Sequence, residues 1–140
     1  MYDKSRIGET VQVPAKDSGS ATTSGYNPKK GEGKYKDIAF PEKVDEGMAA
    51  DGKNLFEIKC SACHKLTDEK LVGPGWFGVT KKNEADWILN FITNTDDMID
   101  KDPQAQAQLA VCMVRMPNQN LSDKDAKALY EFMRKNDGVK

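Results

Sequence analysis

Long apolar runs, an excess of one charge and strand-like alternation are all missing from this 140-residue sequence. No run approaches the roughly 20 apolar residues of a membrane-spanning helix, so the sequence predicts none. Lys and Arg number 21 against 22 Asp and Glu, which argues against a nucleic-acid-binding or polybasic membrane protein. Neither an internal repeat nor a convincing alternating stretch occurs, and the expected fold class is therefore all-α, with one small domain.

Apolar side chains, histidine and cysteine are scarce as well. Hydrophobic residues make up 38% of the chain and charged residues 31%, with one His and three Cys. Burying so few apolar side chains provides little free energy to offset the conformational entropy that the chain loses on folding. Something besides apolar side chains is therefore expected to stabilise the domain.

The N-terminal third differs in composition from the rest. Residues 1–44 are rich in Gly, Ser, Thr and Lys, with few apolar residues and no sustained period. This composition predicts a flexible polar tether or loosely wrapped extension, ahead of a mildly acidic domain over residues 45–140. Such a tether often leads to a lipid anchor, a membrane helix or another domain, and a terminus without a role is the alternative. Tyr2 and Asp3 begin no export signal, so a protein working outside the cytoplasm has had its signal removed.

Periodic apolar positions and capping residues predict four helices. The first follows Asp45 and runs to Cys60, with an apolar stripe in which Gly52 permits the close approach of another helix. The second is capped by Asn83 and ends near Asn94.

The other two helices have clear start signals. Asp102 before a proline opens the third helix, which runs through Leu109 towards Cys112. Ser122 caps the fourth, which stops at Asn136. Two long loops remain in the expected domain, at residues 65–82 and 94–101.

Two of the three cysteines and the single histidine fall within five residues, Cys60-Ser61-Ala62-Cys63-His64. This C-x-x-C-H spacing is the signature of c-type haem attachment. Two thiols three positions apart at the end of a helix can each add to a haem vinyl group, and the next residue can turn its imidazole onto the iron. One segment thus supplies two covalent bonds and an axial ligand.

Chance occurrence of the motif after a helix is one alternative, and two other kinds of site are also possible. A thioredoxin-like redox pair uses C-x-x-C but expects alternating strands and helices, which this sequence lacks. A zinc site needs four ligands, and beyond Cys60, Cys63 and His64 the sequence offers only Cys112 as a further soft donor.

The sequence resembles class I cytochromes c over residues 45–140. The motifs that carry the resemblance are Gly52-Lys53-Asn54-Leu55-Phe56, Cys60-Ser61-Ala62-Cys63-His64, Gly73-Pro74, Met116-Pro117 and Leu121-Ser122-Asp123. The resemblance implies a small helical domain around one haem c, bound covalently through Cys60 and Cys63. It also implies a contact between the first and last helices, where Gly52 and Phe56 would meet Leu129, Phe132 or Met133.

One histidine excludes bis-histidine ligation within the chain, so the second axial ligand is Met, Lys, water or another group. In the resembled family a Met-Pro shortly before a Leu-Ser-Asp helix start holds this position, which assigns Met116. Met113 is the rival. Met48 and Met133 fall on helix stripes and are expected in the core, and Met98 is expected in an acidic loop.

The resemblance gives roles to neighbouring residues as well. The Pro74 carbonyl is expected to accept the proton on the other nitrogen of the axial histidine; a plain turn is the alternative. Trp76, Phe77 and Trp87 are candidates to pack on the porphyrin, and an indole N–H could reach a propionate. Ordinary core packing is equally expected for them. Cys112 is left unpaired and is expected to act as a small buried hydrophobe.

With His64 and Met116 on both faces of the iron no position is left for a substrate, so we expect a one-electron carrier and not an enzyme. The implied partners are redox proteins: a quinol-oxidising complex, a terminal oxidase or a denitrification reductase. The resemblance also implies a periplasmic location, free or membrane-anchored. The alternatives are a haem domain within a larger respiratory complex and a ligand-binding or peroxidatic haem with a labile sixth ligand.

Overall fold

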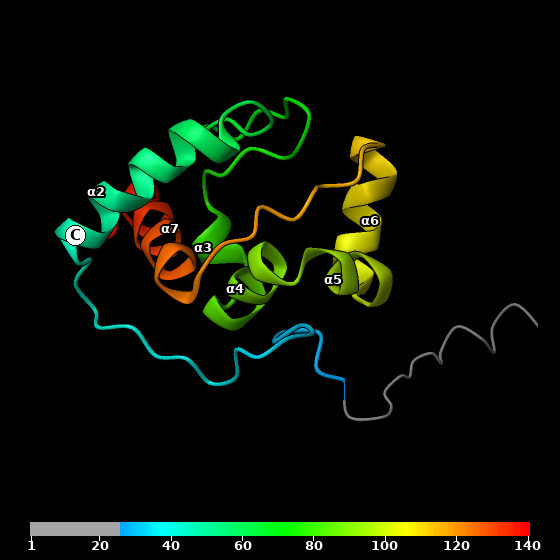
Figure 1. The fold of residues 1–140 in the computed structure, drawn as a ribbon, viewed down its shortest axis with the longest axis horizontal. Helices are drawn as coiled ribbons and strands as arrows, with labels where there is room; N and C mark the ends of the chain where they lie inside the picture. Colours follow the sequence, from blue (N-terminus) through cyan, green and yellow to red (C-terminus); the bar gives the residue numbers. More distant parts are fainter. Residues whose placement is uncertain (1–25) are drawn as a thin grey trace, which may run out of the picture.

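The computed structural model describes residues 26–140, and this part of the chain is helical without strands. The all-α expectation is therefore confirmed. The elements in chain order are α2 (Glu46–Leu55), the π-helical turn η2 (Phe56–Cys60), α3 (Val79–Lys82), α4 (Ala85–Thr93), α5 (Thr95–Lys101), α6 (Pro103–Cys112) and α7 (Asp123–Asn136). Figure 1 shows α2 lying across α7, with α5 and α6 at the opposite end of the domain. None of the helices in residues 26–140 has the length and apolar character needed to cross a membrane.

Side-chain caps explain where α2, α6 and α7 begin. The Asp102 carboxylate accepts a hydrogen bond from the Ala105 amide at 2.9 Å, and Ser122 Oγ accepts one from the Asp125 amide at 3.1 Å. Each satisfies an amide that has no partner within its helix, and both predicted caps are confirmed. The second predicted helix starts slightly later than expected, with Glu84 in the cap position of α4.

Two predicted loops contain helices. The stretch 65–82 ends in the four-residue α3, and the stretch 94–101 is almost entirely α5. Met98, expected in an acidic loop, is fully buried, and Ile99 is 4% exposed. Two buried apolar side chains in seven residues are too few to show a helical period in the sequence, which explains the miss.

The predicted contact between the first and last helices is present at Gly52. A Cβ atom there would lie 2.8 Å from the Cβ of Phe132 and closer still to the carbonyl oxygen of Ala128. The rings of Phe56 and Phe132 lie 5.7 Å apart. Glycine at this position therefore lets α2 and α7 approach to backbone contact.

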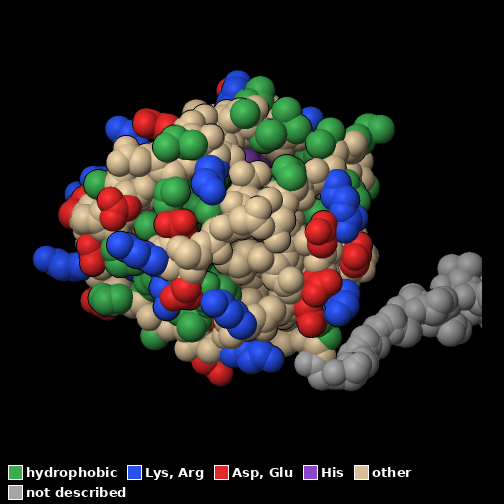
Figure 2. Space-filling model, in the orientation of Figure 1, with side chains coloured by type: hydrophobic (Ala, Val, Ile, Leu, Met, Phe, Trp, Pro, Cys, Tyr) green, Lys and Arg blue, Asp and Glu red, His purple; other side chains and the backbone are tan. Residues whose placement is uncertain are grey.

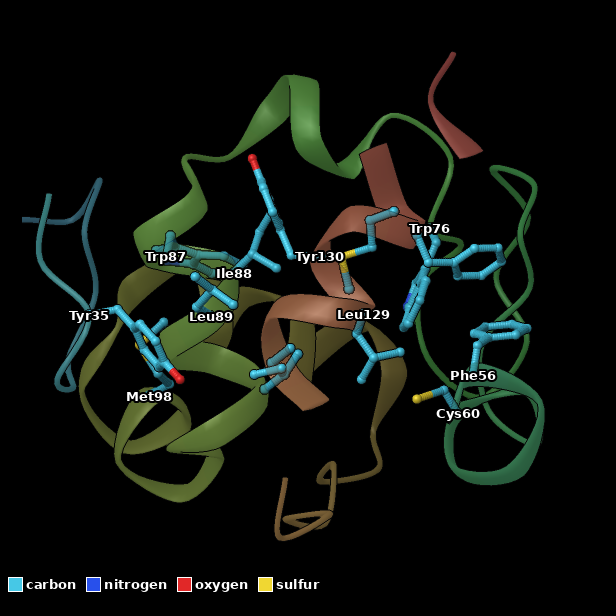
Figure 3. Close-up of a cluster of buried hydrophobic side chains, with 14 residues drawn as sticks. Tyr35, Phe56, Cys60, Trp76, Trp87, Ile88, Leu89, Met98, Leu129 and Tyr130 are labelled. Atoms are coloured by element: carbon cyan, nitrogen blue, oxygen red, sulfur yellow. The ribbon is translucent and has the colours of Figure 1, made fainter. Parts of the chain in front are cut away.

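The core joins these two helices to α4 and α5. In Figure 3, Phe56, Cys60 and Trp76 lie on one side, Trp87, Leu89, Met98 and Tyr35 lie on the other, and Leu129 lies between them. Leu129 is 1% exposed and Leu89 is fully buried. The side of the core formed by Phe56, Cys60 and Trp76 belongs to the segment that carries the C-x-x-C-H motif.

Residues 26–44, which we call the strap, pack against the domain. The strap runs past α4 to the start of α2 (Figure 1). Tyr35 is 2% exposed, its amide donates to Asn90 Oδ1 at 3.0 Å, and Asn90 Nδ2 donates to the carbonyls of Lys30 and Tyr35. The Asp86 carboxylate accepts the amides of Asp37 and Ile38 at 2.6 and 2.9 Å.

The end of the strap is held by a buried ion pair on α7. Arg134 bonds Glu131 at 2.9 Å and donates to the carbonyls of Pro41 and Glu42, while Glu131 accepts the Asp45 amide. Buried polar side chains of the domain thus hold the strap backbone, while Tyr35 and Val44 add apolar burial of their own. Of the two forms expected for residues 1–44, a flexible tether or a wrapped extension, residues 26–44 are packed on the domain as an extension, and residues 1–25 lie outside the described part.

Candidate functional site

The C-x-x-C-H motif sits where the first helical segment turns back on itself. The η2 turn ends with the Ser61 amide bonded to the Phe56 carbonyl, and the amides of Cys63 and His64 then both bond the Cys60 carbonyl, at 3.1 and 3.0 Å. This tight reversal places the two cysteines and the histidine on one short segment. Cys60 is 7% exposed, and burial raises the pKa of its thiol to about 11.

The imidazole of His64 is fixed from one side. Its Nδ1 lies 2.8 Å from the Pro74 carbonyl oxygen, the contact expected from the sequence. Because a carbonyl only accepts, Nδ1 carries the proton and Nε2 keeps its lone pair free for a metal. Burial lowers the pKa of His64, opposed by the bond to Pro74. The ring is therefore neutral at neutral pH, which is the form that binds iron.

Two features hold the Pro74 carbonyl against the ring. The amides of Val72 and Gly73 bond the Cys63 carbonyl at 3.2 and 2.8 Å, which folds the loop back onto the motif. A Cβ at Gly73 would lie 2.6 Å from Cε1 of His64, so the loop approaches the ring as closely as glycine permits. Gly73 thus allows the loop to approach the imidazole closely, and the Pro74 carbonyl accepts its hydrogen bond.

His64 and Met116 face the same hollow. They line both of two adjoining cavities, of about 80 and 120 Å³, and share these walls with Pro74, Phe91 and Gln108. Cys63 lines the first cavity, and Cys60 is buried in the adjacent core. Figure 2 shows the histidine at the bottom of an opening surrounded by hydrophobic side chains.

The other methionines are placed less well to face His64. Met113 is 83% exposed and lines neither cavity, whereas Met116 is half-buried. Met133 lines the second cavity from α7, and Met98 is enclosed by the core. Of the two rivals in the loop between α6 and α7, the geometry therefore favours Met116.

Trp87, in the wall of the second cavity, carries a buried donor without an acceptor. Trp87 is 3% exposed, lines this cavity, and its indole Nε1 is buried without a hydrogen-bond partner. A buried N–H without an acceptor is costly, and a haem propionate is an acceptor of the kind this position requires. Trp76 also lines the cavity, with its ring 5.6 Å from that of His64. Phe77, expected near the porphyrin, is 51% exposed and lines neither cavity.

The third cysteine stands apart from the motif in sequence but close to the site. Cys112 is half-buried at the end of α6 and lines the first cavity. Across residues 26–140 no three His, Cys, Asp or Glu side chains form a cluster that could hold a metal ion. The zinc alternative thus lacks a ligand set in that part of the chain.

Several wall residues had no signal in the sequence. Gln108 faces the site from α6, a helix that alternates Gln and Ala and has no apolar stripe to orient it. Trp87, from α4, and Met116, from the loop between α6 and α7, line the second cavity together only in the folded chain. The attachment motif, the two proline motifs, Trp76, Trp87 and Cys112 were recognisable in the sequence before the fold was known.

Comparison with known proteins agrees with this geometry. The sequence profile of the family described as Cytochrome c matches residues 49–137. The structure is similar to that of a cytochrome c from Rhodothermus marinus, with a TM-score of 0.73 and 30% identity over 77% of this chain and 92% of that one. An engineered form of that cytochrome, Rma TDE, gives a TM-score of 0.72 at 30% identity, over 75% of this chain and 90% of that one. No curated protein matches the chain.

Proposed function

This chain belongs to the cytochrome c family, whose members transfer electrons through haem, and we propose that it carries single electrons on one haem c. In this proposal the haem is bound through Cys60 and Cys63 and ligated by His64 and Met116. The observation that supports it most directly is that His64 and Met116 line the same two cavities, with Nδ1 of His64 already bonded to Pro74.

The bound haem supplies an iron that alternates between the ferric and ferrous states. The chain's own residues set how readily it does so. His64 presents Nε2 in a fixed orientation, because the Pro74 carbonyl holds the opposite nitrogen. Met116 offers a soft thioether, which stabilises ferrous iron. Trp87 Nε1 would be available to donate to a propionate, which would satisfy a donor that has no partner in the described part of the chain.

Two protein ligands leave the iron without an open position, so we propose a carrier and not an enzyme. Docking would take place at the opening above His64, where Val72 and Val114 line the first cavity and are 37% and 54% exposed. An apolar rim suits a brief contact through a small interface. We propose redox proteins as partners, namely a quinol-oxidising complex, a terminal oxidase or a denitrification reductase. The proposed location is periplasmic, free or membrane-anchored.

The test is the visible spectrum of the haem-loaded protein, oxidised and reduced, with and without carbon monoxide. We expect a low-spin spectrum with the weak ferric sulfur-to-iron band and no response to carbon monoxide. Met116→Ala should abolish the band and admit carbon monoxide. Met113→Ala is the matched control, since it removes an exposed methionine from the same loop, and it should leave both properties unchanged. A high-spin wild-type protein, or loss of the band in the Met113 variant, would refute the proposed ligation.

A further inference from the structure

The loop that carries Met116, residues 113–122, joins α6 to α7 and crosses the face of the domain between them (Figure 1). It contains no helix, and its attachment to the rest of the domain is sparse. In the described part of the chain, the hydrogen bonds that tie residues 114–120 to other elements come from just two side chains, those of Arg115 and Lys59. A segment with so few bonds opens at lower cost than a packed helix.

Arg115 joins the loop to α5. One guanidinium nitrogen lies 2.8 Å from Asp100 Oδ1 and donates to the Asp96 carbonyl at 3.3 Å, and Nε lies 3.5 Å from Asp96 Oδ1. Met98 and Ile99, between the two aspartates, are buried. The aspartates therefore project from a helix that is itself held by the core, which makes α5 a firm support for the arginine.

Lys59 holds the loop from the other side. Its Nζ donates to the Gln119 carbonyl at 3.2 Å, from the η2 turn that ends in Cys60. Met116 thus lies between two attachment points, one at the preceding residue and one three residues later. Arg115 also lines the first cavity beside Met116 and His64, so a movement of its side chain is a movement at the site.

We propose that Arg115 is a positioning residue for Met116: its ion pairs with Asp96 and Asp100 hold the loop closed and keep the Met116 thioether facing His64. This inference rests on the proposed His64 and Met116 ligation. Breaking the pairs lets the loop open, and a small molecule can then occupy the position that the thioether leaves.

The effect should be modest and sensitive to salt, because the pair is partly exposed. Arg115 is 43% exposed, Asp96 69% and Asp100 59%. Ion pairs of this exposure are weak and are screened by added salt. Loss of Arg115 is therefore expected to raise the open fraction of the loop about two- to fivefold.

The experiment uses the haem-loaded protein and measures imidazole affinity in the ferric state and the rate of carbon monoxide binding in the ferrous state. The variants are Arg115→Gln, Asp100→Asn and the double variant, each in a series of KCl concentrations. The control is Lys135→Gln, which removes an ion pair of 2.7 Å to Glu46 between α7 and α2, with partners 56% and 62% exposed. This ion pair has an exposure similar to that of the Arg115 pairs, but it lies away from the loop that carries Met116.

We expect Arg115→Gln to bind imidazole about two- to fivefold more tightly than the wild-type protein and to bind carbon monoxide faster by a similar factor. The double variant should go no further than Arg115→Gln alone, because both changes remove the same pair. Salt should promote ligand binding in the wild-type protein and have little effect on Arg115→Gln.

Equal binding by Arg115→Gln and Lys135→Gln, or additive effects in the double variant, would overturn the role of Arg115. Met116→Ala separates this failure from failure of the ligation itself. If Met116→Ala keeps the ferric sulfur band, the ligand assignment is wrong. If it loses the band while Arg115→Gln matches the control, the ligation stands and the positioning role does not.

Discussion

Replacing each of two glycines in α2 with alanine should change the free energy of unfolding in opposite directions. At Gly52 a Cβ would lie 2.7 Å from the Ala128 carbonyl carbon and closer still to its oxygen. At Gly47, also in α2, the nearest atom would be Asp45 Oδ1 at 3.5 Å, an ordinary contact. Alanine favours a helix over glycine by about 1 kcal/mol, so packing decides the difference between the two sites.

The magnitude follows from how far the helices must separate. Non-bonded carbon atoms prefer separations of roughly 3.5–4.0 Å, so α2 and α7 would have to move apart by about 1 Å at Gly52. Overpacking of this kind costs about 1–3 kcal/mol, occasionally more, and backbone atoms cannot rotate out of the way as a side chain can. Because the contact is with backbone atoms, we take the upper end of that range, about 3 kcal/mol, and subtract about 1 kcal/mol for helix propensity. Gly52→Ala should then lose about 2 kcal/mol, and Gly47→Ala should gain about 0.5–1 kcal/mol.

Thermal unfolding of the haem-loaded protein, followed by helical circular dichroism, tests the pair. For a domain of this size each kcal/mol corresponds to about 4 °C in Tm, so Gly52→Ala should melt about 8 °C lower and Gly47→Ala about 2–4 °C higher. A Gly52→Ala variant as stable as the wild-type protein would refute the close helix contact. A matching loss in Gly47→Ala would show that glycine is needed in α2 for some other reason.

Three further predictions concern single residues. Met113→Gly should raise the free energy of unfolding by about 0.5–1 kcal/mol, because Met113 ends α6 with a φ of 63°, where glycine carries no steric cost. Chemical denaturation would measure the change, and a lower free energy of unfolding would contradict the left-handed conformation at this residue. Trp87→Phe should cost the haem-loaded protein about 1.5–3 kcal/mol, the value of a hydrogen bond to a charged group, whereas a cost near zero would mean that Nε1 has no acceptor there. For Asp86, burial raises the pKa, but the amides of Ile38 and Asp37 together with Lys30 outweigh it and hold the pKa below that of an ordinary aspartate. The stabilisation from its carboxylate is complete above about pH 4 and is lost as the pH falls further, so Asp86→Asn should reduce the acid sensitivity of Tm.

The sequence predicted the features that depend on neighbouring residues. The caps at Asp102 and Ser122 act within three residues, and the helices they begin were located from them. The spacing of Cys60, Cys63 and His64 is likewise local, and so a haem site was predictable without a fold.

The features that were missed depend on distant residues. The strap is ordered because Asn90 and Asp86 on α4 meet its backbone, and nothing in its own composition reveals that. Likewise Arg115 looks like any exposed cation until α5 places Asp100 beside it. Its proximity to Met116 in the chain was visible, but the partner that gives it a role was not.

The strap also bears on where this protein can be cut or joined. The family profile begins at residue 49, yet a chain trimmed to that point would remove the backbone partners of Asp86, Asn90 and Arg134. It would also remove Tyr35 and Val44, which are 2% and 7% exposed, from the core. Each lost hydrogen bond is worth about 0.5–1.5 kcal/mol, and together these losses are a large share of the stability of a small domain. A graft or fusion of this domain should therefore keep residues 26–48, because the segment that must be transferred for folding is longer than the segment that defines the family.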